Sequence, residues 1–395
     1  MSCMTRYVLA ELTKVFLVAL AGLTTLMLLV GVVREAVAQG LPPAQVLRLM
    51  PFVLPDALRF AVPVTLLLAV TMVYARMSGF NEIVALKACG ISPLVMLWPA
   101  WVVGFLASLT TVWLNDLAPT WGRAGIRRVV IEAAEDIAYS MLRTERRFTG
   151  RRLSINVKRV EGRTLIRPTV TVARRGSTPP ITVTAETARI ETDYRERVLR
   201  IEFRNGTMDI EGRATFSFLE PRTIELPLSD ASGPEESAPS PSCIPLADIP
   251  RETAEQQAAI VRQEQQMAAE AACRMFTGDF DLLASGVWAP RAGQLAEMRG
   301  RLFRLRLEPY RRWSTGFSCL FFVWVGAPMA VWLRKPEPLT AFFLCFAPIL
   351  IVYYPWLIYG INGAKNGTIP PVLVWSGNVV LLAWGTWVLR RVIRY

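Results

Sequence analysis

The chain has 395 residues, of which 52% are hydrophobic and only 19% are charged, so its composition excludes an ordinary soluble globular protein and indicates a membrane protein. Lys and Arg (44) outnumber Asp and Glu (32), and most of the basic residues lie in the middle of the chain, which is therefore a polar domain. Histidine is absent and the six cysteines form no C-x-x-C pair, which excludes histidine-based catalytic triads, redox motifs and nearly every zinc site. We expect no catalytic residue, no metal site and no cofactor.

Six apolar segments predict helices that cross a membrane. Five of them are uncharged runs of about 20 residues, the length that a helix needs to span a bilayer: 15–33, 94–114, 313–333, 339–361 and 369–389. A sixth and shorter run, 60–75, requires a helix that starts near Phe52 and carries Asp56 and Arg59 at its outer end. The first run follows basic residues as a secretory signal does, but it is too long for one, so we expect an uncleaved span.

The spans are arranged as three, then a large domain, then three more. This order places both termini on one side of the membrane. Lys and Arg in the short segments on that side outnumber those in the two short loops opposite, which favours cytoplasmic termini and a large domain outside. The basic flanks of the large domain count against this orientation, but long translocated domains follow the charge rule poorly.

A short segment at 76–93 links the second and third spans on the side of the termini. Ser78 can cap a helix there, Glu82 falls in its first turn and Gly90 can end it. Ile83 and Leu86 share one face. Two interpretations stay open: a solvated turn between spans, or a coupling helix that docks on a cytoplasmic ATPase and offers Glu82 to a basic residue.

The polar middle begins with an all-β pattern. From 146 to 228 apolar residues alternate with polar ones, which predicts strands, and the spacing favours a sandwich or an open jelly roll. Four dipeptides mark turns between the strands: Glu161-Gly162, Arg175-Gly176, Asp193-Tyr194 and Asn205-Gly206.

Two further patterns follow the predicted strands. The segment 231–250 is rich in Pro, Ser and Ala and is typical of a linker. Strong helix formers fill 251–275, and 289–312 predicts a second, very basic helix or helical hairpin that leads into the membrane.

An energy source is missing from the chain. No G-x-x-x-x-G-K-[ST] motif occurs, and Gly-Lys is absent altogether, so an ATP-driven transporter of this sequence would need a separate motor. The spans carry no relay of Asp, Glu or His, which disfavours a proton- or ion-coupled carrier.

The stretch 41–93 resembles the lipopolysaccharide export permease family of the LptF/LptG type. In that family a Leu- and Pro-rich span runs into Arg or Lys, and a Ser-and-Glu segment follows that closes with Ala-Cys-Gly or Ala-Ser-Gly, here Ala88-Cys89-Gly90. The stretch 302–334 with its Gly326-Ala327-Pro328, the three-plus-three spans and the Arg-rich C-terminus are similar too. The Ala-Cys-Gly version leans toward the LptF-like branch.

The resemblance implies an α-helical membrane protein with six transmembrane helices (3+3) and an inserted periplasmic all-β jelly-roll-like domain. It implies a non-enzymatic, multi-pass permease subunit of an ABC-type exporter in the bacterial inner membrane, which extracts lipopolysaccharide or a related glycolipid. The implied partners are a homologous six-span permease, a dimeric cytoplasmic ATPase and a periplasmic jelly-roll bridge protein; nucleic acid is not among them. The helical segment after 250 departs from the compact family pattern.

The resemblance also implies roles for single residues. Glu82 would be the acid of the coupling helix, with Ile83, Leu86 and Lys87 beside it. Arginines gather at the outer ends of the spans, and guanidinium groups suit forked contact with a phosphorylated headgroup. Single interfacial arginines often only anchor helices or contact anionic lipid, so the group is better evidence than any member. The predicted headgroup residues are Arg34, Arg48, Arg59, Arg123, Arg127, Arg128, Arg304, Arg306, Arg311 and Arg312.

These inferences divide the chain into three parts. Residues 1–115 hold the first three spans and the coupling helix at 76–93, and 309–395 hold the last three. Residues 116–308 form the periplasmic domain, with the β jelly roll at about 146–230, the linker at 231–250 and the helical segment at 251–308. Two rival functions remain: a membrane-anchored periplasmic sensor or scaffold, for which six spans are excessive, and an ABC permease for another substrate such as a lipoprotein or peptide.

Overall fold

The computed structural model forms two compact units. It describes residues 3–39, 43–90, 92–132, 139, 141–143, 146–149, 153–172, 181–193, 198–210, 214–227, 240–278, 288–333 and 337–394. The helical unit comprises Met1–Met27, Leu54–Trp121 and Ser240–Tyr395, and the β unit comprises Leu28–Val53 and Gly122–Pro239. The segment 251–308, predicted as part of the periplasmic domain, groups with the membrane helices, because its second part belongs to the helix that continues into the fourth span and its first part packs on that helix.

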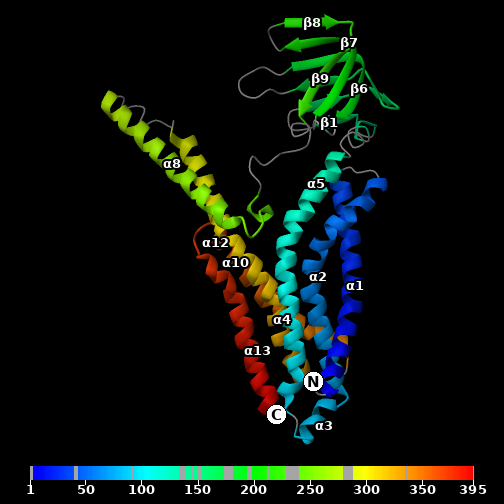
Figure 1. The fold of residues 1–395 in the computed structure, drawn as a ribbon, viewed down its shortest axis with the longest axis vertical. Coiled ribbons are helices and arrows are strands. Elements are labelled where there is room, and N and C mark those ends of the chain that lie inside the picture. Colours follow the sequence, from blue (N-terminus) through cyan, green and yellow to red (C-terminus); the bar gives the residue numbers. More distant parts are fainter. Residues whose placement is uncertain are drawn as a thin grey trace. The chain divides into compact units, whose positions relative to one another are not determined.

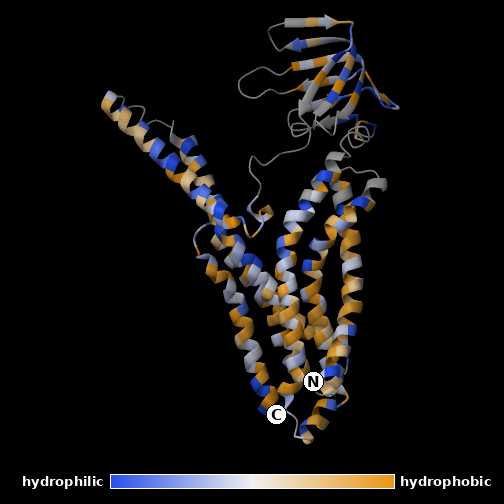
Figure 2. Ribbon diagram, viewed as in Figure 1, coloured by the Kyte–Doolittle hydropathy of each residue, from blue (hydrophilic) through white to orange (hydrophobic). Residues whose placement is uncertain are grey.

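Among the described residues, six helical segments are long and apolar enough to cross a membrane, as predicted. They are α1 (Cys3–Gln39), α2 (Pro43–Gly79), α4 (Pro93–Leu117) with the π turn η1 (Ala118–Gly122), α10 (Trp288–Leu333), α11 (Pro338–Pro348) continued by η3 (Ile349–Tyr353) and α12 (Tyr354–Lys365), and α13 (Ser376–Arg394) after the 3-10 turn η4 (Pro371–Trp375). Hydrophobic residues cover much of these helices, whereas the half of α10 that lies beside α8 is rich in hydrophilic residues (Figure 2).

The core of the helical unit lies around α2 and α10. In the most apolar stretch of each of these helices 67% of the residues are buried, against 11% in α1, so α1 presents most of its surface to the surroundings. Helices α4 and α10 approach closely: a Cβ at Gly316 would lie 2.3 Å from Val112 Cγ2, so only glycine fits there. Farther along the same contact, the Ser108 hydroxyl accepts a hydrogen bond from the Leu320 amide at 3.0 Å.

The predicted second basic helix is not a separate element. Residues 289–312 form the first half of α10, which runs without a break through Pro309 into the membrane span. Helix α8 (Ile249–Thr277) packs along this half as a hairpin (Figure 1). Ion pairs join the two arms, including Arg299 with Glu264 at 2.7 Å and Arg291 with Glu270.

A curled antiparallel sheet makes up most of the β unit (Figure 1). In the described residues its nine strands are β1 (Arg147–Thr149), β2 (Leu153–Asn156), β3 (Arg159–Glu161), β4 (Thr164–Ile166), β5 (Thr169–Val172), β6 (Ile181–Asp193), β7 (Val198–Ile210), β8 (Ala214–Phe218) and β9 (Arg222–Pro227). The path β1-β2-β5-β6-β4-β3 is extended by β7, which pairs with β6, β8 and β9.

The two long strands β6 and β7 hold this sheet together. Their inward residues alternate as the sequence predicts, and Val183, Ile190, Ile201 and Phe203 are all fully buried. The period-two prediction is therefore confirmed.

The turn signals of the β segment have mixed outcomes. Glu161-Gly162 does turn the chain between β3 and β4, with φ +62° at the glycine. The turn predicted at Asn205-Gly206 is wrong, because both residues lie inside β7. Asn205 adopts φ 51° and is missing from the paired residues, but the register between β6 and β7 is the same on both sides of it. A Cβ at Gly206 would lie 2.5 Å from the Thr184 carbonyl oxygen, so the two strands approach closely at this local distortion.

The other predicted turn signals and the linker fall partly outside the described residues. Arg175-Gly176, Tyr194 and the first part of the linker, 231–239, lie there. The second part of the predicted linker has defined structure: it contains the 3-10 turn η2 (Pro241–Cys243), and α8 already begins at Ile249. Cys243 and Cys273 are present as thiols, not as a disulfide.

Candidate functional site

Helix α3 (Glu82–Ala88) occupies the predicted position between the second and third spans. Its N-cap is Asn81, in the left-handed conformation at φ 59°, and Gly90 at φ +79° follows its end. The predicted cap at Ser78 is wrong, because α2 continues through Gly79 and Ser78 is still helical. The chain reverses only at Phe80 and Asn81.

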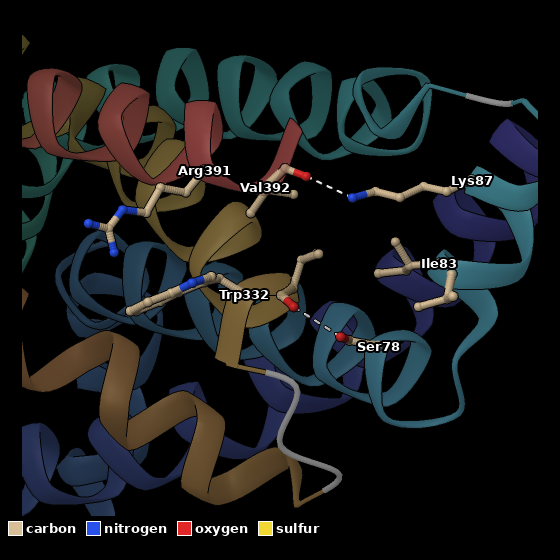
Figure 3. A pocket seen from close by; sticks show the side chains of 8 residues that line it. Ser78, Ile83, Lys87, Trp332, Arg391 and Val392 are labelled. Carbon is tan, nitrogen blue, oxygen red and sulfur yellow. Dashed lines mark hydrogen bonds between the residues drawn. The ribbon is translucent and has the colours of Figure 1, made fainter. Parts of the chain in front are cut away.

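One face of α3 packs inward. Ile83 is 4% exposed and belongs to the same apolar cluster as Val331 of α10 and Val392 of α13, and Leu86 packs against that cluster. The Lys87 ammonium donates to the Val392 carbonyl oxygen at 2.8 Å (Figure 3). The predicted coupling residues Ile83, Leu86 and Lys87 therefore contact this chain's own helices.

A small pocket separates α3 from the ends of α10 and α13. Its volume is about 110 Å³, and its lining is Ser78, Ile83, Val84, Lys87, Val331, Trp332, Arg391 and Val392. Arg391 points away from Lys87 (Figure 3), with its guanidinium 4.1 Å from the centre of the Trp387 ring. The pocket is thus lined largely by apolar side chains, and the Lys87 ammonium reaches across it to α13.

The other face of α3 is open to the surroundings. Phe80, in the turn before α3, is 74% exposed, and Val84, which also lines the edge of the pocket, is 46% exposed. Glu82 is half-buried. Exposed large apolar side chains on and next to a short helix are features of a protein-docking surface. The sequence analysis did not single out Phe80 and Val84, although their spacing of four residues was visible in it.

Five predicted headgroup arginines lie in the β unit. The four whose side chains the structure describes are exposed: Arg34, Arg48, Arg123 and Arg128. The end of α1, the start of α2 and helix α5 (Arg123–Glu132) pack through one apolar cluster that contains Val32, Leu49, Val53 and Val129. Since Arg34, Arg48 and Arg128 each lie within two residues of a member of this cluster, the fold gathers them on one group of helix ends. The side chain of Arg127 lies outside the described residues.

Five predicted headgroup arginines lie in the helical unit, in different states. Arg304 and Arg306 are exposed on the outer half of α10. Arg59 pairs with Asp56 at 2.8 Å, and Arg311 pairs with Glu308 at 2.7 Å.

Arg312 differs from all the others because it is buried, with 2% of its side chain exposed. Its guanidinium donates to Asp116 of α4 and to the carbonyl oxygens of Ser242 at 3.0 Å and Ile244 at 2.8 Å, and its Nε lies 3.4 Å from Glu308. We therefore leave Arg312 out of the proposed headgroup set: its donors are used inside the protein.

Comparison with known proteins gives one result. The family model of the lipopolysaccharide export system permease LptF/LptG matches residues 6–391, which is nearly the whole chain. The search of curated proteins found no match. The match includes all six apolar helices, the β unit and helix α3. With its six apolar helices and its antiparallel sheet domain, the chain belongs to the LptF/LptG family of lipopolysaccharide export system permeases.

Proposed function

We propose that this chain is one permease subunit of an ABC-type exporter that extracts lipopolysaccharide, or a related glycolipid, from the inner membrane. It works with a homologous six-span permease, and a separate dimeric ATPase supplies the energy. Family membership supports the transport role, and the exposed face of α3 supports a docked motor. The closing Ala88-Cys89-Gly90 favours the LptF-like position in the pair.

The proposed topology places both termini and α3 in the cytoplasm. The spans are then grouped three plus three, and the β unit lies in the periplasm as a jelly roll that passes lipid to a bridge protein of similar fold. The excess of Lys and Arg in the short loops on the side of the termini supports this orientation. The edge strands of the antiparallel sheet offer main-chain groups to a partner strand, which supports the bridge.

Glu82 is the proposed contact with the motor. It begins α3, whose inner face is held by the helical core while its outer face is open, so a partner reaches Phe80, Glu82 and Val84 without disturbing the fold. A carboxylate flanked by apolar side chains suits a groove with one basic residue. The position of α3 between two spans is the observation that carries the proposal.

The outer arginines other than the buried Arg312 are the proposed headgroup residues; Arg59 and Arg311 among them are half-buried in ion pairs. In the helical unit the set is Arg59, Arg304, Arg306 and Arg311; in the β unit it is Arg34, Arg48, Arg123, Arg127 and Arg128. Several guanidinium groups on exposed helix ends can each form charge-assisted bonds to the phosphates of an anionic glycolipid. The set binds the headgroup while the apolar chains stay in the membrane.

A transport assay tests the proposed function. The chain is reconstituted with its partner permease and the ATPase in liposomes that contain lipopolysaccharide, and ATP-dependent release of the lipid to a periplasmic acceptor is measured. The parental complex should release lipid only with ATP, and Glu82→Lys should abolish both ATPase binding and release. Glu82→Gln, which keeps the shape and removes the charge, is the matched variant. ATP-independent release, or full activity of Glu82→Lys, would contradict the proposal.

A further inference from the structure

The end of α2 and helix α3 are each hydrogen-bonded to a helix from the far end of the chain. The Ser78 hydroxyl, one turn before α3, donates to the Val331 carbonyl oxygen at 3.0 Å, and the Lys87 ammonium donates to the Val392 carbonyl oxygen at 2.8 Å. The two contacts join residues 253 and 305 positions apart. Figure 3 shows both bonds on opposite sides of the pocket.

Both acceptors belong to the last turns of helices. Val331 is two residues from the end of α10 at Leu333, and Val392 is two residues from the end of α13 at Arg394. Carbonyl groups in a last helical turn have no partner within the helix, and a cation near them is favoured by the helix dipole. Ser78 and Lys87 therefore donate hydrogen bonds to two carbonyl groups that have no partner within their own helices.

The side chain of Ile83 lines the pocket between the two hydrogen bonds. It is 4% exposed and shares its cluster with both Val331 and Val392. Two contacts of α3, from Lys87 and Ile83, and one contact of the end of α2, from Ser78, thus connect this segment to α10 and α13. Because hydrogen-bonded and packed elements move together, we expect a movement of α3 to move the ends of these two helices.

We infer that Lys87 in α3 and Ser78 in the last turn of α2 are positioning residues that transmit movement of α3 to α13 and α10. The inference rests on the proposed function, in which an ATPase moves α3. Lys87 was predicted to lie at the motor contact, but its ammonium is directed into the chain's own helix end. In this assignment Glu82 contacts the ATPase from the outer side of α3, and Lys87 transmits the movement of α3 to α13 from its inner side.

This division of roles has a measurable consequence. Without the Lys87 bond the outer face of α3 is unchanged, so the ATPase still binds and hydrolyses ATP. The link to α13 is weakened, so less of each motor movement reaches the membrane helices. Lys87→Met should therefore lower the lipopolysaccharide released per ATP severalfold while ATPase binding stays at the parental level. A purely structural defect would instead lower the yield of folded complex and both activities in parallel.

The experiment uses the reconstituted complex of both permeases with the ATPase. Four variants are compared. Lys87→Met removes the hydrogen bond to α13, and Lys87→Arg keeps a cationic donor and should retain most of the coupling. Ser78→Ala removes the hydrogen bond to α10 with little change in volume, and Lys14→Met is the control at an exposed lysine. ATPase binding, ATP hydrolysis and lipid release are measured on the same samples.

Each outcome decides one of the two claims. The inference is overturned if Lys87→Met and Ser78→Ala both release as much lipid per ATP as the parental complex. It is also overturned if Lys87→Met loses ATPase binding while Lys14→Met binds normally. If Lys87→Met does not assemble, the same ratio measured for Ser78→Ala decides. The proposed function fails separately, when Glu82→Lys still binds the ATPase and supports release.

Discussion

Arg312 donates a hydrogen bond to Asp116, a residue 196 positions earlier in the chain. The same carboxylate oxygen accepts from the Leu246 amide at 2.8 Å, and Arg312 also holds the carbonyl groups of Ser242 and Ile244. The segment 242–246, which lies in the predicted linker just before α8, is thereby attached to α4 and α10. Ile244 and Ile249 pack on Leu305 beside it.

Removal of Arg312 is expected to destabilise the helical unit strongly. Arg312→Met leaves Asp116 without its ion-pair partner and the carbonyl groups of Ser242 and Ile244 without a donor, and breaking one side of a buried ion pair costs on the order of 3 kcal/mol. Thermal unfolding in detergent should show a lower Tm, and hydrogen exchange at 242–246 should accelerate.

Two comparisons make that prediction specific. Arg304→Met removes an exposed arginine from the same helix and should change stability by less than about 0.5 kcal/mol. Asp116→Asn combined with Arg312→Met should cost less than the sum of the two single changes, because both remove the same interaction. Additive losses would show that the two residues act independently.

The sequence predicted features whose signals are local. Alternation along β6 and β7 and the charge-free runs of the spans depend on neighbouring residues alone. The continuity of α10 was missed, because its basic first half and apolar second half differ in composition but not in helix propensity. The roles of Arg312 and Lys87 were missed because their partners, Asp116 and Val392, are brought near only by folding.

The exposed arginines at the ends of α1 and α2 are expected to contribute to headgroup binding. Changing Arg34 and Arg48 together to Gln should reduce photocrosslinking to a phosphorylated glycolipid. Because both side chains are exposed, the loss of binding free energy should be smaller than the roughly 1.5 to 3 kcal/mol that a charge-assisted hydrogen bond contributes where water is excluded. Raised salt should weaken the remaining contacts further. Arg390 and Arg394, exposed at the end of α13, form the control pair, and an equal loss from both pairs would mean that the arginines only anchor helices.

The proposed topology predicts opposite labelling of two exposed cysteines. In variants that keep a single cysteine, a membrane-impermeant maleimide added to cells with a permeabilised outer membrane should label Cys273 of α8 and should not label Cys89 after α3. Cys89 should react only after the inner membrane is opened. Labelling in the reverse order would place the termini outside.

The hairpin of α8 and α10 is expected to loosen in acid. A hydrogen bond from Arg291 holds the pKa of the Glu270 carboxyl below its usual range, and Arg274 adds to the effect. A lowered pKa in the folded state gives stability that is present above the unfolded pKa, about 4.3, and is lost as the pH falls through the folded value. Hydrogen exchange in α8, corrected for its intrinsic pH dependence, should therefore rise below about pH 4. Glu270→Gln should remove most of this pH dependence, and a profile unchanged by that substitution would contradict the assignment.

The most direct test of the central claim is the composition of the complex in which the chain exists. The chain is purified by an affinity tag from native membranes in mild detergent, and the polypeptides that accompany it are identified and quantified by mass spectrometry. The account predicts a second six-span permease and an ATPase in stoichiometric amounts, with the ATPase lost from the Glu82→Lys preparation and retained in Lys87→Met. A homogeneous assembly of this chain alone, with no ATPase, would contradict it.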